Sequence, residues 1–431
     1  MYLKVVIIGN GITGITTARH IRKLNNAHIT VISDETAYFF SRTALMYVYM
    51  GHLKFEHTQP YENWFWKKNK INLLQARVDK IDFLHKKILL NDESFLNYDK
   101  LIIATGSLPR TVDVPGQHLK GVQGLYHKQD VELMEKNTAG IRKAVIIGGG
   151  LIGIEMAEML HSRNIAVDFL IREQHYWASV LPIPEATMIS KHIAEYHINL
   201  HPQTELKEII GDKNGAVKSI ITSDNTEIEC QFVGITIGVQ PNVNFLKNSE
   251  IAIDKGILVN DFLETNIADV YAAGDCAQFI HPKHKHPAIE QLWYTGKMQG
   301  EALAQTICGH KTMYNRGVWF NSAKFLAIEY QTYGAMFNTP AKGDTTFYWE
   351  HPKGKIAMRA NFNASNFTLT GFNFMGIRFR QAVAENWIIA QKNIWEVMEN
   401  LSLGFFDPEF FTNHHQPILT QFLQQYPKPI A

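Results

Sequence analysis

A chain of 431 residues exceeds what one hydrophobic core usually serves, so two or three domains are expected. Hydrophobic residues make up 45% of it, and 42 basic against 41 acidic side chains leave a net charge of +1. This balance argues against disorder and against nucleic acid or an anionic membrane as the main partner. The sequence shows no export signal, no apolar run that could span a membrane and no metal-type spacing among its three cysteines. We therefore expect a cytoplasmic protein without a metal site.

The first predicted unit is a strand, a helix and a second strand within residues 4–33, read from KVVIIG, ITGITTARHIRKL and HITVIS. This βαβ context gives weight to the G-x-G-x-x-G motif between the first strand and the helix. Gly9 permits the tight turn, Gly11 lets the backbone approach a pyrophosphate, and Gly14 lets the helix pack closely on the strand. The free N–H groups at the start of the helix favour phosphate. The unit therefore predicts a dinucleotide site.

The same order recurs within residues 143–171, in KAVIIGGG, LIGIEMAEMLHSR and AVDFLI. Its glycines are Gly148, Gly150 and Gly153, at the spacing of the first motif. One dinucleotide needs one such turn. Two turns this far apart therefore predict two doubly wound domains that hold two nucleotides.

The residue that binds a ribose in such a unit follows its second strand. In the first unit the candidates are Asp34 and Glu35, with Asp34 preferred. In the second unit Arg172 and Glu173 follow the strand. An arginine suits the 2′-phosphate of NADPH, whereas an acid suits the bare ribose diol of NADH. Both donors stay open, with a slight preference for NADPH.

Two connecting segments that contain Pro and Gly flank the second unit: KLIIATGSLPRTVDVPG before it and GITIGVQPN after it. We therefore interpret the second unit as inserted into the first domain. After about residue 316 the pattern changes. KIAMRANF and FTLTGFNF alternate polar and apolar residues around the turn NASN, which predicts a hairpin. Residues 378–401 carry apolar side chains at helical intervals, which predicts one helix packed in a core or a subunit interface.

Four stretches, GNGITG, IIATGS, GGGLIGIEMA and TNIADVYAAGD, together resemble the glutathione-reductase superfamily of flavoprotein pyridine-nucleotide oxidoreductases, over essentially the full chain. The resemblance implies FAD in the outer domain and NADH or NADPH in the inserted one. The expected fold is α/β, with two Rossmann-like doubly wound domains and a C-terminal α+β domain whose presence implies a homodimer. The expected divisions are residues 1–110 and 243–315 for FAD, 111–242 for NAD(P)H and 316–431 for the C-terminal interface domain.

The resemblance also implies which residues bind each cofactor. Asp275 of AAGD would hydrogen-bond the ribityl or phosphate region of FAD. The helix that starts at Trp293 would face the pyrimidine edge of the flavin, where its N-terminus stabilises the reduced form. PAIEQLW leaves either Glu290 or Gln291 in the place of a family glutamate. The further residues expected to bind FAD are Arg42, Ala104, Thr105, Gly106, Gly274, Gln291 and Leu292. Besides the glycines and the two ribose candidates, those expected to bind NAD(P)H are Glu155 and Gly238.

A redox cysteine separates the branches of this superfamily. Disulfide reductases carry a C-x-x-x-x-C pair on an early helix, whereas this chain has no cysteine before Cys230. Coenzyme A-disulfide reductases and water-forming NADH oxidases carry one cysteine in an S-C-G stretch, where this chain has Arg42. Mixed-disulfide chemistry needs a thiolate beside the flavin. SRTALMY instead resembles the R-P-x-L-S-K stretch of the ferredoxin-, rubredoxin- and nitrite-reductase branch, which places Arg42 near the FAD pyrophosphate.

Two positions depart from that branch. Tyr47 replaces a lysine close to flavin N5, so Glu155, which usually pairs with that lysine beside the nicotinamide, has lost its partner. Asn321 replaces a tryptophan that covers one face of the flavin, which leaves the acceptor side more open or differently shaped. Arg42, Tyr47 and Glu155 are the candidate catalytic residues.

The resulting hypothesis is an NAD(P)H-dependent FAD oxidoreductase. It passes electrons from reduced flavin to an acceptor without a protein disulfide, and the branch implies a small iron-sulfur or rubredoxin-type carrier protein. Two alternatives stay open. One is a quinone- or oxygen-reducing NAD(P)H dehydrogenase or oxidase, and the other is a redox-sensing flavoprotein that resembles apoptosis-inducing factor.

Overall fold

The structure is a computed structural model that describes residues 2–282 and 287–428. The chain forms two compact units, each made of three segments. The first unit comprises Met1–Thr111, Gln123–Ala139 and Gly238–Arg316. The second comprises Val112–Val122, Gly140–Ile237 and Gly317–Ala431. The three-domain division drawn from the sequence stays a prediction.

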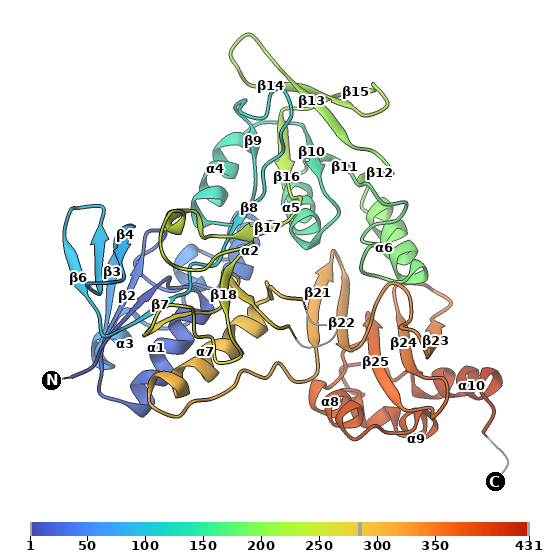
Figure 1. Cartoon of the computed structure of the whole chain (residues 1–431). Helices are drawn as coiled ribbons and strands as arrows, with labels where there is room; N and C mark the ends of the chain where they lie inside the picture. Colours follow the sequence, from blue (N-terminus) through green and yellow to red (C-terminus); the bar gives the residue numbers. More distant parts are fainter. Residues whose placement is uncertain (1, 283–286, 429–431) are drawn as a thin grey trace. The chain divides into compact units, whose positions relative to one another are not determined.

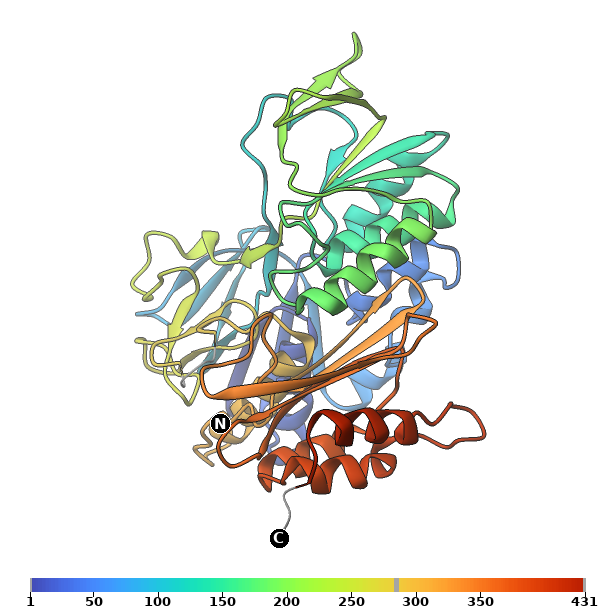
Figure 2. The same ribbon diagram turned by 90° about the vertical axis from the view of Figure 1, so that its right-hand side faces the viewer.

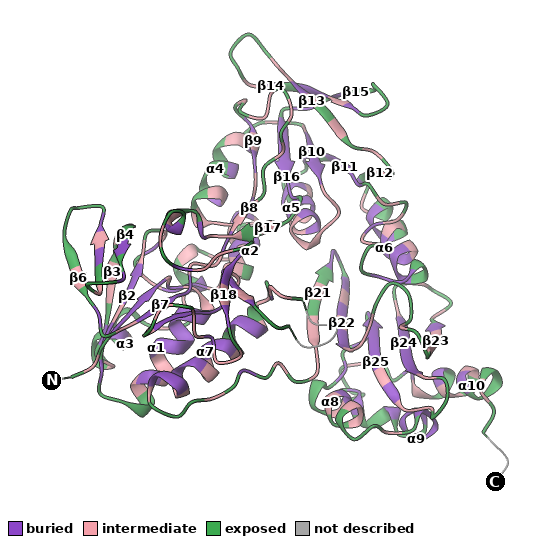
Figure 3. Cartoon of the chain, viewed as in Figure 1, coloured by how far each residue is buried: buried purple, intermediate pink, exposed green. Residues whose placement is uncertain are grey.

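Five strands form the main sheet of the first unit: β1 (Lys4–Ile8), β2 (His28–Ser33), β3 (Ile71–Gln75), β7 (Lys100–Ile103) and β19 (Val270–Ala272). Their order is β19-β7-β1-β2-β3, and every neighbouring pair is parallel. The inner strands are buried almost throughout (Figure 3). Continuous apolar runs such as VVII form such strands because both faces of a parallel sheet are covered.

Helices and smaller strands complete the first unit (Figure 1). The two long helices, α1 (Ile12–Leu24) and α7 (Trp293–Ile307), pack side by side, because a glycine of α7 lets the backbones approach: a Cβ on Gly300 would lie 2.7 Å from Thr13 O. The other helices are α2 (Leu45–Tyr49), α3 (Asn63–Lys68) and α4 (Lys128–Thr138). The smaller strands form three further sheets. One antiparallel sheet contains β4 (Val78–Asp82), β5 (Lys87–Leu90) and β6 (Phe95–Asn97). In the other two, β8 (Ser107–Pro109) pairs with β17 (Val239–Pro241), and β18 (Ile257–Val259) pairs with β20 (Ala277–Phe279).

A second five-stranded sheet has the order β12-β11-β10-β16-β9. Its parallel strands are β10 (Lys143–Ile147), β11 (Ala166–Leu170), β12 (Asn199–His201) and β16 (Phe232–Ile235), and β9 (Val122–Gln123) lies at its edge. Helix α5 (Leu151–Ser162) connects β10 to β11, and α6 (Ile183–Glu195) connects β11 to β12. An antiparallel sheet of β13 (Leu206–Gly211), β14 (Val217–Thr222) and β15 (Glu227–Glu229) follows. Both predicted βαβ units are therefore confirmed.

The C-terminal part of the second unit is an antiparallel sheet with helices on one side. The order β21-β22-β25-β24-β23 is formed by β21 (Phe320–Phe325), β22 (Ile328–Gly334), β23 (Asp344–Glu350), β24 (Ala357–Asn363) and β25 (Leu369–Met375). The helices α8 (Gln381–Ile389), α9 (Ile394–Glu399) and α10 (His415–Gln425) lie along one face of this sheet in both views (Figures 1 and 2). The predicted hairpin is confirmed, since β24 pairs with β25. With two parallel α/β sheets and this antiparallel sheet, the predicted fold class is confirmed.

The prediction of one helix over residues 378–401 is wrong. The chain leaves the helix after Ile389, adopts φ = +49° at Gln391 and starts again at Ile394. Asn393 caps the new helix, because its side chain accepts a hydrogen bond from Trp395 N at 3.1 Å. The apolar spacing continues across the break, so periodicity alone did not reveal it.

Within the described part of the chain, no helix is long and apolar enough to cross a membrane. The same residues contain no group of three His, Cys, Asp or Glu side chains placed to hold a metal ion.

Candidate functional site

The first glycine turn, between β1 and α1, requires glycine at Gly9 and Gly14. Gly9 has φ = +112°, and a Cβ there would lie 2.1 Å from Ala104 O. A Cβ on Gly14 would lie 2.0 Å from Gly9 O. A Cβ on Gly11, the N-cap residue, would meet nothing within 4 Å, and the first turn of α1 has neither a side-chain cap nor an acidic residue. The turn thus presents helix N–H groups in the arrangement that a pyrophosphate needs.

Asp275 lies in a hydrogen-bonded cluster just after β19. Its carboxylate accepts a hydrogen bond from Ser107 Oγ at 2.9 Å, and the Tyr126 hydroxyl is a second partner. Gln291 Nε2 donates to the same Ser107 Oγ at 3.0 Å. Burial raises the pKa of Asp275, and burial beside Asp275 raises the pKa of Tyr126 to about 12. A carboxylate held in this way is positioned to accept hydrogen bonds from the hydroxyl groups of a sugar chain.

Sequence reasoning missed two members of this cluster, Ser107 and Tyr126. Ser107 follows Gly106 directly in the stretch IIATGS, so its place in the motif was an available signal. Tyr126 lies 19 residues from Ser107, whose backbone N–H donates to its hydroxyl at 3.2 Å. Nothing in the local pattern around Tyr126 indicates this contact, which depends on the tertiary fold.

Glu290 and Gln291 have different hydrogen-bond partners in the structure. Glu290 is only 3% exposed, and its carboxylate accepts a hydrogen bond from the Tyr314 hydroxyl at 2.7 Å and pairs with Arg316 Nη1 at 3.3 Å. It is therefore part of a buried ion pair. Gln291 is the residue that joins the cluster around Asp275.

Arg42 makes a two-pronged ion pair with Glu35, with distances of 2.9 Å for Nη1–Oε1 and 2.6 Å for Nη2–Oε2. Arg42 Nη1 also donates to Tyr126 O at 2.6 Å, and Glu35 Oε1 accepts from the backbone N–H of Lys128 at 2.9 Å. Burial lowers the pKa of Arg42, but the hydrogen bond to Glu35 and the charges of Glu35, Tyr126 and Asp275 together outweigh burial, so the pKa is raised. Because Glu35 is engaged by the protein and Asp34 is exposed, Asp34 stays the preferred ribose ligand.

Three more residues expected to bind FAD lie at the ends of β7 and β19. Thr105 Oγ1 donates to Asn242 O at 2.7 Å. Gly106 has φ = +69°. Gly274 has φ = +80°, and a Cβ there would lie 2.5 Å from Thr13 Oγ1. The tight packing of Gly274 on α1 brings the turn before Asp275 close to the first glycine motif.

The remaining residues expected near the flavin lie on α2 and at the start of α7. Leu292 is the N-cap of α7, which has no side-chain cap and no acidic residue in its first turn. Trp293 is 38% exposed and meets the ring of Tyr294 edge-on at 5.4 Å. Tyr47 is half-buried on α2 and stacks on His52, with 6.1 Å between the ring centroids.

The second glycine turn, between β10 and α5, repeats the shape of the first. Gly148 has φ = +109°, and a Cβ there would lie 2.6 Å from Thr236 O. A Cβ on Gly153 would lie 2.5 Å from Gly148 O. Gly150 is the N-cap of α5, whose first turn also lacks a side-chain cap and an acidic residue. Gly238 has φ = +98°, with open space where a side chain would lie. This turn also fits a pyrophosphate.

The two ribose candidates of the second unit have different environments. Arg172 is exposed, whereas Glu173 is half-buried. A Cβ on Gly149, in the middle of the glycine turn, would lie 3.8 Å from Glu173 Oε2. The carboxylate of Glu173 therefore lies next to the turn that would hold the dinucleotide.

Glu155 lies on α5, one turn into the helix, and is half-buried. Burial, assisted by the charge of Glu158, raises the pKa of Glu155 to about 7. Glu158 forms an ion pair with Lys324 at 2.8 Å, and no hydrogen bond of the Glu155 side chain occurs among residues 2–282 and 287–428. Glu155 can therefore change its charge near neutral pH.

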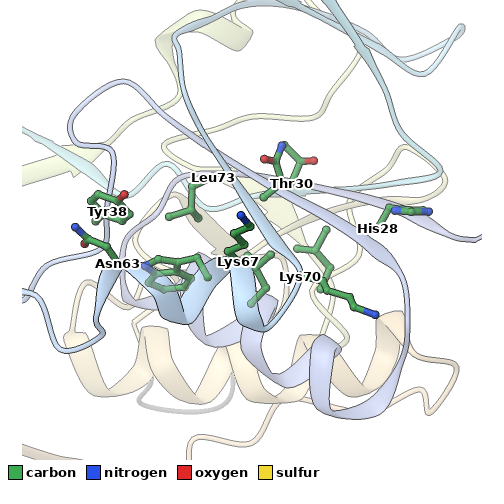
Figure 4. A pocket seen from close by; sticks show the side chains of 11 residues that line it. His28, Thr30, Tyr38, Asn63, Lys67, Lys70 and Leu73 are labelled. Atoms are coloured by element: carbon green, nitrogen blue, oxygen red, sulfur yellow. The ribbon is translucent and has the colours of Figure 1, made fainter.

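A hollow of about 590 Å³ lies elsewhere in the first unit, against β2, α3 and β3 (Figure 4). Figure 4 shows its lining side chains, which include three basic groups, His28, Lys67 and Lys70. None of the residues predicted to bind a cofactor lines it. The hollow is separate from the candidate site.

The chain is similar to known oxidoreductases. The family model described as pyridine nucleotide-disulphide oxidoreductase matches residues 3–300. The NAD(P)H nitrite reductase of Bacillus subtilis (strain 168) is 27% identical over 366 residues, which are 83% of this chain and 44% of that protein. The NADH-rubredoxin oxidoreductase of Clostridium acetobutylicum is 28% identical over 314 residues, 72% of this chain and 76% of that protein.

The fold is also found among solved structures. A ferredoxin reductase from Rhodopseudomonas palustris superposes with a TM-score of 0.80 at 22% identity, covering 97% of this chain and 99% of that one. The chain spans less than half the length of the nitrite reductase it matches.

Proposed function

Because the chain belongs to the pyridine nucleotide-disulphide oxidoreductase family, we propose that it is an FAD-dependent NAD(P)H oxidoreductase that reduces a small electron-carrier protein. The family and its reductase relatives use FAD and NAD(P)H, the two cofactors that the family resemblance implied for the two glycine turns. FAD, when bound, would supply the chemistry that takes a hydride from NAD(P)H and passes electrons on to the acceptor. A ferredoxin or rubredoxin is the proposed acceptor, since reductases of such carriers are among the relatives.

The absence of a usable thiol at the flavin carries this proposal. Arg42 stands where related enzymes have a redox cysteine, and its guanidinium is held by Glu35. Burial raises the pKa of all three cysteines, to about 12 for Cys230, although Cys308 is only partly buried. Cys276, next to Asp275, is 0% exposed. A protonated, buried thiol does not attack a disulfide, so electrons leave the flavin directly.

Residues of the chain have three proposed tasks. The first turn of α1 holds the FAD pyrophosphate, and Asp275 fixes the hydroxyl-bearing part of FAD. The open N-terminus of α7 places a partial positive charge at the flavin and favours its reduced form. Glu155 orients the nicotinamide or its carboxamide from α5.

The first experiment is an anaerobic titration of the purified protein with NADH and with NADPH, followed by the absorbance of oxidised flavin. Rapid bleaching by one donor is expected, followed by fast reoxidation by rubredoxin or ferredoxin. Reoxidation only by quinones or oxygen would replace the proposed acceptor. A reduced state that forms slowly and persists would instead support a redox sensor.

We expect NADH to be the preferred donor, because Glu173 lies against the glycine turn and Arg172 is exposed. Glu173→Ala should raise the KM for NADH about tenfold, since a carboxylate that binds a ribose diol makes charge-assisted hydrogen bonds. Arg172→Ala serves as the neighbouring control and should leave the KM for NADH nearly unchanged. Steady-state kinetics with both donors test this. A loss of NADPH use in Arg172→Ala that exceeds its loss of NADH use would restore the NADPH preference.

A pH dependence of flavin reduction is expected from Glu155, whose pKa is about 7. Below that pH the carboxyl group is protonated and neutral, and above it the group is charged. A carboxylate stabilises the positive charge that the nicotinamide acquires as the hydride leaves, so the reduction rate should rise as pH increases through about 7. Glu155→Gln should remove this rise. Stopped-flow reduction over a range of pH values measures it, and a rise that persists in Glu155→Gln would assign it to another group.

We also propose that the chain works as a homodimer in the cytoplasm. The three unpaired cysteines suit a reducing compartment, and the family resemblance supports the dimer. Light scattering of the purified protein tests the oligomeric state.

A further inference from the structure

The segment between β11 and α6 carries the ribose candidates and then makes an unusual turn. Trp177 has φ = +59°, a left-handed backbone conformation that a bulky side chain rarely adopts. Such a conformation persists only where surrounding contacts hold it, and it often marks a functional segment. The contacts that hold Trp177 therefore indicate what the turn is for.

Those contacts come from the C-terminal sheet of the same unit. The centroid of the Trp177 ring lies 5.4 Å from the ring centroid of Phe325 on β21 and 5.8 Å from that of Tyr330 on β22. Asn338 Nδ2 donates to Ala178 O at 3.2 Å. Phe325 is 0% exposed, so its ring is fully enclosed. The sheet thus supplies two aromatic side chains, Phe325 and Tyr330, against which the turn at Trp177 packs.

Tyr176, the residue before Trp177, contacts both Phe325 and the second glycine turn. Tyr176 is 0% exposed, and its ring meets Phe325 edge-on at 6.1 Å. Its hydroxyl donates to Gly150 O at 2.5 Å. Gly150 is the N-cap of α5, where the phosphates of the dinucleotide would bind. Tyr176 therefore contacts both the C-terminal sheet, through Phe325, and the second glycine turn, through Gly150.

We propose that the C-terminal sheet positions the nicotinamide dinucleotide site, with Phe325 fixing Tyr176 and Tyr176 holding the carbonyl of Gly150. The inference rests on the proposed function, because it assumes that NADH binds at this turn. Tyr176 is a positioning residue: its oxygen bonds to the protein backbone, and it acts on the ligand through the N-cap. The C-terminal part of the chain is then required for donor binding, in addition to any role in assembly.

Two variants test the proposal in the FAD-loaded full chain. Tyr176→Phe keeps the ring and removes only the hydroxyl. Phe325→Leu keeps apolar volume and removes the ring that supports Tyr176 and Trp177. Phe362→Leu is the matched control, since Phe362 lies in the same sheet, is also 0% exposed and packs on Phe367 instead. The probe is a tetrahydro analogue of NADH, which binds but cannot give up a hydride, measured by calorimetry.

Tyr176→Phe and Phe325→Leu should each weaken binding of the analogue about three- to tenfold, the effect of one well-placed hydrogen bond. Both variants should keep the limiting rate of flavin reduction at saturating NADH within about twofold of the rate of the unmodified protein. Their FAD content should likewise stay within about twofold of that of the unmodified protein. Phe362→Leu should leave binding unchanged. Unchanged binding in both test variants, or an equal loss in Phe362→Leu, would overturn the proposal. Failure of the unmodified protein to bind the analogue would contradict the proposed function itself, and the inference with it.

Discussion

Asp275→Ala is expected to purify with less than about a tenth of the FAD found in the unmodified protein. The carboxylate of Asp275 is held by Ser107 and Tyr126, and the family resemblance assigns it to the hydroxyl-bearing part of FAD. Removing it would delete the hydrogen-bond acceptor proposed for the cofactor and would leave the Ser107 hydroxyl, which still accepts from Gln291, without the acceptor for its own proton. A loss of about 1–3 kcal/mol for each such group corresponds to a fall in affinity of roughly fivefold to a hundredfold. The ratio of flavin to protein absorbance measures the outcome.

Asp269→Ala is the matched control for this experiment. Asp269 lies in the same segment, just before β19, but its carboxylate pairs at the surface with Lys86 and Lys100. Its loss should leave the FAD content unchanged. Asp275→Asn should retain more FAD than Asp275→Ala, because an amide oxygen can still accept hydrogen bonds. Full FAD in Asp275→Ala would contradict the placement of the cofactor at this turn.

The two glycine turns were predictable because their constraint is local. A backbone with φ near +110° at Gly9 and Gly148, and a carbonyl oxygen within about 2–3 Å of any Cβ, requires glycine whatever the rest of the chain does. The strand before each turn and the helix after it are likewise encoded by runs of neighbouring residues. The hairpin around the turn NASN belongs to the same class, since alternation and turn composition specify it together.

Features that depend on distant residues were not predictable. Glu35 fits a ribose ligand by its place after β2, but Arg42 and Lys128 occupy its carboxylate. Tyr126 joins Asp275 from far along the chain. Tyr176 reads as one more aromatic residue in the sequence, and only the fold brings its hydroxyl to Gly150. Local patterns thus located the two glycine turns, while the side chains that support them required the tertiary structure.

Arg359→Met is expected to lower the free energy of unfolding of the second unit by about 3–5 kcal/mol. Arg359, on β24, makes a two-pronged ion pair with Glu185 on α6, at 2.6 Å and 2.8 Å. The two side chains are 7% and 1% exposed. Methionine removes the cation but keeps most of the volume, so Glu185 is left as a buried charge without its partner. Urea unfolding followed by tryptophan fluorescence measures the change.

The double variant Arg359→Met/Glu185→Met separates two effects on the free energy of unfolding. One is the destabilisation caused by leaving a single buried charge, and the other is the net contribution of the intact ion pair. Two apolar side chains in place of a buried ion pair are often neutral or stabilising, so the double variant should regain most of the lost stability. The pair would then contribute alignment of α6 against the C-terminal sheet rather than net stability, in keeping with the positioning role inferred for that sheet. Binding of the NADH analogue distinguishes the two contributions, because the double variant should be stable yet bind it more weakly. A double variant as unstable as Arg359→Met would mean that the ion pair itself stabilises the fold.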